Sequence, residues 1–170
     1  MCYMDINKFT ARLDAFNWHN YEHVPSVLKA LALATEESTD GIIIIKGSEA
    51  DLLLNAKISN SVLSTIGNNH GGYYYPVAVD ALPFIAEVAL YGNHIVARNC
   101  AINILIDLYY FCPDVGCDDL MPIVRAEIEN IVSENIANFI KFADDDKRNT
   151  SLIHESLMSV FIKDGEASDI

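Results

Sequence analysis

The chain repeats one short step three times, in which an apolar residue and a proline precede a helix-forming apolar run: Val24-Pro25-Ser26-Val27-Leu28, Leu82-Pro83-Phe84-Ile85-Ala86 and Met121-Pro122-Ile123-Val124-Arg125. The three prolines stand 58 residues (83 − 25) and 39 residues (122 − 83) apart. The second interval is close to the roughly 40–47 residues of a repeat that is built from a pair of helices. The step therefore predicts a helical repeat protein, whose stacked pairs leave an extended surface for another macromolecule.

Proline, glycine and capping signals divide the chain into helices. They predict a short first helix and then three pairs, at 7–17, then 25–37 with 49–66, 76–91 with 94–111, and 118–142 with 149–162. An insertion loop at about 35–47 explains the longer first interval, and the tail 164–170 is expected to be frayed. We therefore expect one all-α domain, residues 1–170, built as a HEAT- or armadillo-like α-solenoid of about three helical hairpins.

Two helices of the second pair have further signals. Pro83 lies inside the helix at 76–91 and is expected to kink it. The helix from His94 to Phe111 is apolar almost all round, so we expect it to be the central and most buried element.

Charge and cysteine usage limit the classes of partner and compartment. With 11 Lys and Arg against 24 Asp and Glu, the formal charge is −13, which repels nucleic acid and anionic membranes and attracts a basic protein. We see no secretory signal at the N-terminus and no run near the ~18 apolar residues of a membrane span. The four cysteines form neither a C-x-x-C motif nor a disulfide framework, and Cys100 is expected to be a buried free thiol. These features favour a cytoplasmic protein.

The least ordinary local stretch joins the first and second pairs: Ile66-Gly67-Asn68-Asn69-His70-Gly71-Gly72-Tyr73-Tyr74-Tyr75-Pro76. Tyrosines are enriched at protein interfaces, so His70, Tyr73, Tyr74 and Tyr75 are candidate partner-binding residues. Alternatively the stretch is a turn between repeats, with the histidine bonded to backbone and the tyrosines packed in the core. A phosphate-binding loop is not expected, because no strand precedes the glycines and no lysine follows them.

Two polar stripes are further candidates for partner binding. Asn99, Asn103 and Asp107 follow i, i+4, i+8 spacing on the apolar helix at 94–111, and we expect them to face the groove of the solenoid. Glu127 and Glu134 lie on the polar side of the helix at 118–142, where acidic residues would steer a basic partner. The alternatives are side chains that satisfy neighbouring backbone and an ordinary solvated helix face.

One motif suggests an enzyme. His19-Asn20-Tyr21-Glu22-His23 matches H-x-x-E-H, in which two histidines one helical turn apart bind zinc and the glutamate acts as base. That chemistry needs a continuous helix, whereas Pro25 disfavours helical geometry at the residue before it. We therefore assign no catalytic, metal or cofactor residues, and keep a zinc hydrolase as a minor alternative.

The residues also resemble a known group. The residues that carry this resemblance are Trp18, Val24-Pro25, the His70-Gly71 turn with its Tyr-Pro helix start, Ala81-Leu82-Pro83-Phe84-Ile85 and Arg98. With them, roughly residues 18–111 resemble bacterial HEAT-like repeat proteins. Several members look like immunity proteins that block a cognate bacterial toxin. The chain departs from the group at Ile42–Ile45, and the group has no fixed binding motif to carry over.

The leading hypothesis is an immunity protein that neutralises a basic toxin, with aromatic anchors at Tyr73 to Tyr75 and acidic steering residues at the rim. The second is a HEAT-like scaffold or regulatory subunit of a larger assembly. A toxin gene next to this one would favour the first hypothesis over the second. The toxin's activity and the oligomeric state are open at this point.

Overall fold

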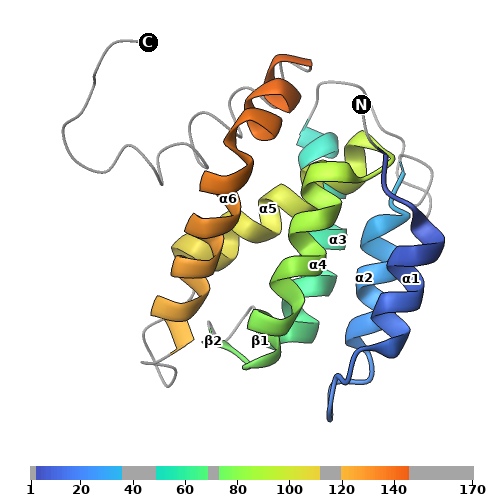
Figure 1. Ribbon diagram of the computed structural model, residues 1–170, viewed down its shortest axis with the longest axis vertical. Coiled ribbons are helices and arrows are strands. Elements are labelled where there is room, and N and C mark those ends of the chain that lie inside the picture. Colours follow the sequence, from blue (N-terminus) through green and yellow to red (C-terminus); the bar gives the residue numbers. More distant parts are fainter. Residues whose placement is uncertain (1–2, 36–48, 69–72, 112–119, 146–170) are drawn as a thin grey trace.

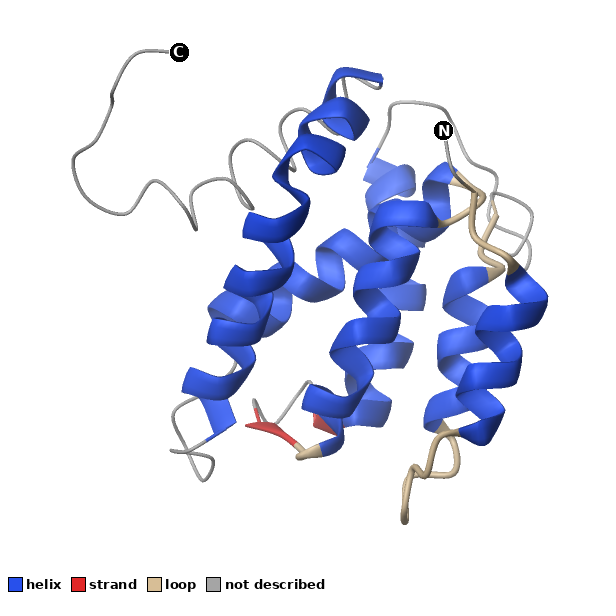
Figure 2. Cartoon of the chain, in the orientation of Figure 1, coloured by secondary structure: helices blue, strands red, loops and turns tan. Residues whose placement is uncertain are grey.

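The structure is a computed structural model, and it describes residues 3–35, 49–68, 73–111 and 120–145. In these ranges the chain forms six helices and one very short hairpin (Figures 1 and 2). The elements are α1 (Ile6–Ala15), α2 (Val24–Ala32), α3 (Glu49–Ile66), β1 (Gly67–Asn68), β2 (Tyr73–Tyr74), α4 (Val77–Tyr91), α5 (Ile95–Phe111) and α6 (Leu120–Asp145). The predicted all-α class is confirmed.

The described helices pack in two layers. α2, α4 and α6 follow one another across the molecule, with α2 against α4 and α4 against α6, while α3 and α5 pack together behind them (Figure 1). α1 lies on α2. The predicted pairs α2 with α3 and α4 with α5 are each packed helix to helix. The second helix of the third pair, expected at 149–162, lies outside the described residues, as does most of the expected insertion loop.

The centre of the core is shared by α4 and α5, which form the most extensive contact between any two described elements. α5 also packs against α2, α3 and α6, so the prediction that this apolar helix is central is confirmed. Its largest fully buried side chains are Ile102, Ile104 and Leu105. Cys100 is fully buried and, as expected, forms no disulfide among the described residues, and Ser59 of α3 donates a hydrogen bond to its carbonyl oxygen at 3.2 Å.

Most helix limits agree with the sequence signals. Pro25 occupies the first turn of α2, where its missing N–H costs nothing. α2 ends at Ala32 and not near residue 37, because the N–H of Ala34 bonds the carbonyl of Leu31, three residues back, and tightens the last turn. The hairpin of β1 and β2, with Gly67 opposite Tyr74, was not predicted, since two-residue strands are too short to show a period.

Non-helical backbone angles occur inside α6, at Asn135. α4 continues through Pro83 as one helix, and the proline is exposed on its surface. Asn135 of α6 instead has non-helical angles (φ −122°, ψ 17°), and its side-chain amide donates to the carbonyl of Ile131 at 2.8 Å. An asparagine side chain that bonds nearby backbone competes with the helix in this way. The bend in α6 is visible in Figure 1.

Candidate functional site

A groove of about 340 Å³ runs between α4 and α6. α4 lines it with residues at helical spacing along one face, and α6 lines it with residues one turn apart. The lining residues are Pro83, Ala86, Glu87, Leu90 and Tyr91 of α4 and Glu127, Ile131 and Asn135 of α6.

Contacts from α5 hold α6 in place beside α4. The Tyr109 hydroxyl of α5 donates to the Glu129 carboxylate of α6 at 2.8 Å, and the Arg125 guanidinium of α6 donates to the Tyr109 carbonyl at 2.9 Å. Val124, Ile128 and Val132 are buried along the inner side of α6. The wall of the groove that α6 supplies is therefore anchored on the central helix.

The groove combines apolar surface with two carboxylates. Ala86 and Leu90 are buried, and Ile131 packs against the core. Glu87 and Glu127 come from facing helices and are both half-buried. No lysine or arginine is among the lining residues. Within the described ranges, ion pairs join Glu87 to Arg12, Lys8 to Asp5 and Lys29 to Asp14, and none involves Glu127.

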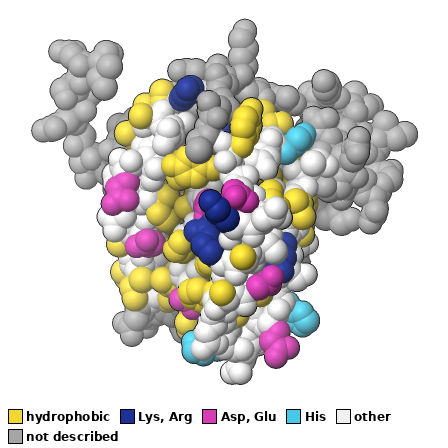
Figure 3. All heavy atoms as spheres, turned by 45° about the vertical axis from the view of Figure 1, so that its right-hand side comes forward, with side chains coloured by type: hydrophobic (Ala, Val, Ile, Leu, Met, Phe, Trp, Pro, Cys, Tyr) yellow, Lys and Arg dark blue, Asp and Glu magenta, His cyan; other side chains and the backbone are white. Residues whose placement is uncertain are grey.

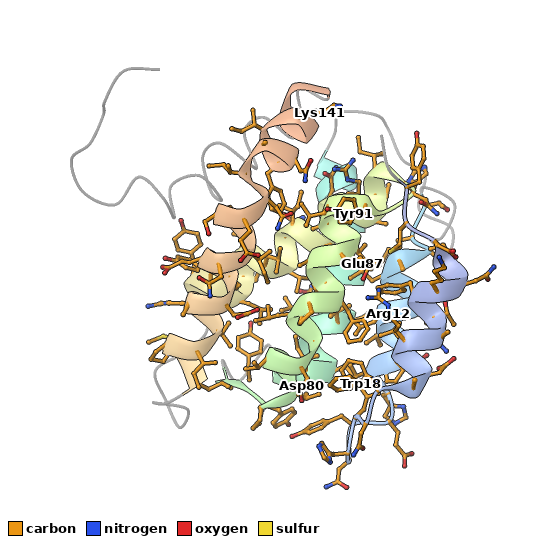
Figure 4. The ribbon with its side chains drawn as sticks, in the orientation of Figure 1. Arg12, Trp18, Asp80, Glu87, Tyr91 and Lys141 are labelled. Carbon is orange, nitrogen blue, oxygen red and sulfur yellow. The ribbon has the colours of Figure 1, made fainter. Side chains whose placement is uncertain are left out.

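The chain supplies its own cation to Glu87. Arg12 of α1 forms an ion pair with the Glu87 carboxylate, and Figure 4 shows the two residues between α1 and α4. The Arg12 guanidinium carbon also lies 6.0 and 5.8 Å from the ring centroids of Phe9 and Phe84. Such a position over aromatic rings is attractive for a guanidinium.

An aromatic cluster lies beside this ion pair. Phe84 of α4 contacts Phe9, Phe16 and Trp18, at centroid separations of 6.0, 5.8 and 5.4 Å. The Trp18 indole N–H donates to the carbonyl of Leu13 at 2.8 Å, which fixes the chain after α1. On the face seen in Figure 3, hydrophobic side chains lie between charged side chains of both signs.

The predicted tyrosines Tyr74 and Tyr75 differ in how deeply they are buried. Tyr74 is 3% exposed and belongs to the core, and Tyr75 is half-buried with its ring 5.6 Å from that of Tyr21. Of Tyr73 only the backbone, in β2, is described, and His70 lies outside the described residues. For Tyr74 this placement agrees with the alternative of core packing.

Of the two predicted polar stripes, only one residue lines the α4–α6 groove. Asn99, Asn103 and Asp107 lie half-buried on α5, in the layer behind, and none of them lines the groove. Glu134 is exposed on α6 outside the groove, so Glu127 alone of the predicted residues lines it. The side-chain oxygen of Asn99 is buried and, among the described residues, has no hydrogen-bond partner.

Sequence reasoning missed the residues that α4 contributes. Glu87 and Asp80 are the charged residues of an otherwise apolar stretch and stand seven residues apart, which places them on one helix face. This spacing indicates that Asp80 and Glu87 form an acidic edge along α4. The spacing alone could not predict that α6 would pack beside that edge.

The residues of the H-x-x-E-H motif do not form the helix that zinc binding requires. His19 has a positive φ of 52°, and residues 19–23 are turns that lead into α2. Residues 19–23 therefore precede the helix as predicted, whereas Val24, which was expected to be non-helical because it precedes Pro25, is the first residue of α2. Among the described residues, no group of three or more His, Cys, Asp or Glu side chains is placed to hold a metal ion.

Burial raises the pKa of the Cys100 thiol to about 12, so that thiol stays protonated.

Comparison of the chain with models of known protein families, with curated proteins and with solved structures gives no match. In the part of the chain that is described, none of the helices has the length and apolar character needed to cross a lipid bilayer.

Replacing Asp107 with asparagine should stabilise the protein at neutral pH. Burial raises the pKa of Asp107 above its ordinary value of 3.8, because desolvation disfavours the carboxylate. Because its pKa is raised in the folded state, the contribution of Asp107 to stability is fully present below pH 3.8 and is lost as the pH rises through the folded-state pKa. Urea unfolding across this range should show a gain for Asp107→Asn at neutral pH and none in acid. The exposed control Glu134→Gln should change little, and a less stable Asp107→Asn at neutral pH would contradict the assignment.

Proposed function

We propose that this chain is a non-catalytic protein-binding module with HEAT-like architecture, and that it acts as an immunity protein for a basic bacterial toxin. The α4–α6 groove carries the proposal, because it offers apolar surface and a carboxylate, Glu127, with no cation of its own among the described residues. A protein interface of this kind combines an apolar centre with complementary charge.

The architecture and the charge support the same function. α2, α4 and α6 succeed one another in one layer with α3 and α5 behind, as successive helical pairs do in a HEAT-like stack. The formal charge of −13 would draw a basic partner toward this surface over long range. The resemblance of residues 18–111 to HEAT-like immunity proteins gives the partner its class.

Capture and neutralisation test the proposal together. Tagged protein would be incubated with lysate from its source organism, and the retained proteins would be released by a salt step and identified by mass spectrometry. We expect one basic protein, whose expression alone arrests growth and whose co-expression with this chain restores it. A stable set of housekeeping subunits, with no growth effect, would instead establish the scaffold alternative.

Reversing charges on α6 should slow capture of the basic partner. The double variant Glu127→Lys, Glu134→Lys should lower the association rate constant by about tenfold at low salt, because steering depends on long-range attraction. The effect should shrink as salt is added. Stopped-flow or surface plasmon resonance at two ionic strengths measures it, and an unchanged rate constant and salt dependence would exclude steering by these residues.

A further inference from the structure

We infer that the α4–α6 groove receives an arginine side chain of the protein partner, with Glu127 as its carboxylate. The inference rests on the proposed function in assigning that arginine to a protein. Charge complementarity selects the occupant, since the two charged lining residues are Glu87 and Glu127 and both are acidic. A neutral or acidic side chain would leave a half-buried carboxylate without a counter-charge.

The size of the groove fits a side chain rather than a helix. Its volume of about 340 Å³ is at the small end of the roughly 300–1,000 Å³ of ligand sites. A long cationic side chain places its methylene groups on apolar surface and its charged head in a polar setting. Here Ala86, Leu90 and Ile131 supply the apolar surface, and Glu127 supplies the polar end.

The protein's own Arg12 shows why arginine fits better than lysine. On the other side of α4, a guanidinium pairs with Glu87 while lying near two aromatic rings. The groove repeats this chemistry, with Glu127 as the carboxylate and Tyr91 as the aromatic residue among its lining side chains. A planar guanidinium stacks on rings and bonds carboxylates through two N–H groups, whereas an ammonium is a strongly hydrated point charge.

Titration with a single capped residue tests the inference without the natural partner. Isotope-labelled protein would be titrated with N-acetyl-arginine methylamide and followed by amide chemical shifts in NMR spectra. We expect saturable shifts at Ala86, Leu90 and Ile131. The uncharged analogue N-acetyl-citrulline methylamide has nearly the same shape and should give none, and the lysine analogue should bind more weakly.

Variants on α6 provide the matched comparison. Glu127→Gln should weaken the apparent affinity for the arginine probe about tenfold, the effect of losing one charged hydrogen bond. Glu134→Gln, on the same helix but outside the groove, should leave it unchanged. Glu127→Asp keeps the negative charge and should retain part of the affinity for the arginine probe. This variant therefore controls for the possibility that substitutions at this position weaken binding by disturbing the fold.

Several results would overturn the inference. The first two are the absence of saturable chemical-shift changes and equal responses to the citrulline and arginine probes. The others are equal affinities for the lysine and arginine probes, and an equal loss of affinity for the arginine probe in Glu127→Gln and Glu134→Gln. If the toxin is captured and neutralised equally well by wild type and Glu127→Gln, the groove inference fails while the proposed function stands. If the arginine probe fills the groove but no toxin is found, the proposed function fails and the arginine site remains.

Discussion

Replacing Phe9 with alanine should lower the free energy of unfolding by about 3–5 kcal/mol, as expected for truncating a large buried aromatic side chain. Phe9 is fully buried, and its ring meets that of Phe84 edge to face at 6.0 Å. Its loss leaves a cavity between α1 and α4 and removes one of the rings beside Arg12. Urea unfolding followed by circular dichroism measures the change.

The matched control for this variant is an exposed aromatic residue close by in sequence. Tyr3 is 66% exposed, so Tyr3→Ala should change the free energy of unfolding by no more than about 0.5 kcal/mol. If Phe9→Ala were as mild as Tyr3→Ala, α1 would not be packed on the core as the structure places it.

Replacing Arg98 with methionine should cost about 1–3 kcal/mol of stability, because it deprives a buried polar group of its partner. Arg98 is 8% exposed and lies in the first turn of α5. Its Nε donates to the carbonyl of Ala89 at 3.1 Å, close to the C-terminus of α4, where a positive charge is also favourable. Methionine keeps most of the apolar stem and removes the donor.

Exposed Lys141 on α6 is the control for Arg98. Lys141→Met also removes one positive charge, but it leaves no buried carbonyl without a donor, so we expect a change within about 0.5 kcal/mol. Thermal unfolding of both variants beside wild type separates the two effects. A gain in stability from Arg98→Met would show that burying the guanidinium costs more than its hydrogen bond returns.

The sequence was most informative where a helix limit is set by local chemistry. α3 begins at Glu49 and ends at Ile66 as predicted, since a serine precedes it and Gly67 follows it. The end of α2 was placed too late because residues 33–37 favour a helix by propensity, whereas the chain turns after Ala32. The irregularity at Asn135 was not predicted, because it depends on a side-chain amide that bonds the helix backbone in competition with the regular hydrogen bonds.

The candidate site was harder to predict than the helices. Its two walls come from α4 and α6, which are separated by the whole of α5, and only the packing of these helices brings them together. Glu127 was predicted as a solvated steering residue, yet it lies half-buried against apolar neighbours. The i, i+4, i+8 spacing places Asn99, Asn103 and Asp107 along one face of α5, and none of the three lines the groove between α4 and α6.

The ion pair between Arg12 and Glu87 gives the protein an internal optical reporter. Glu87 lines the groove on one side of α4 and pairs with Arg12 of α1 on the other, so a guanidinium that binds Glu127 in the groove adds a positive charge beside this ion pair. Trp18, the sole tryptophan of the chain, is 6% exposed and lies in the aromatic cluster beside that pair. Its emission can therefore register occupancy of the groove from the opposite side of α4, with no added label.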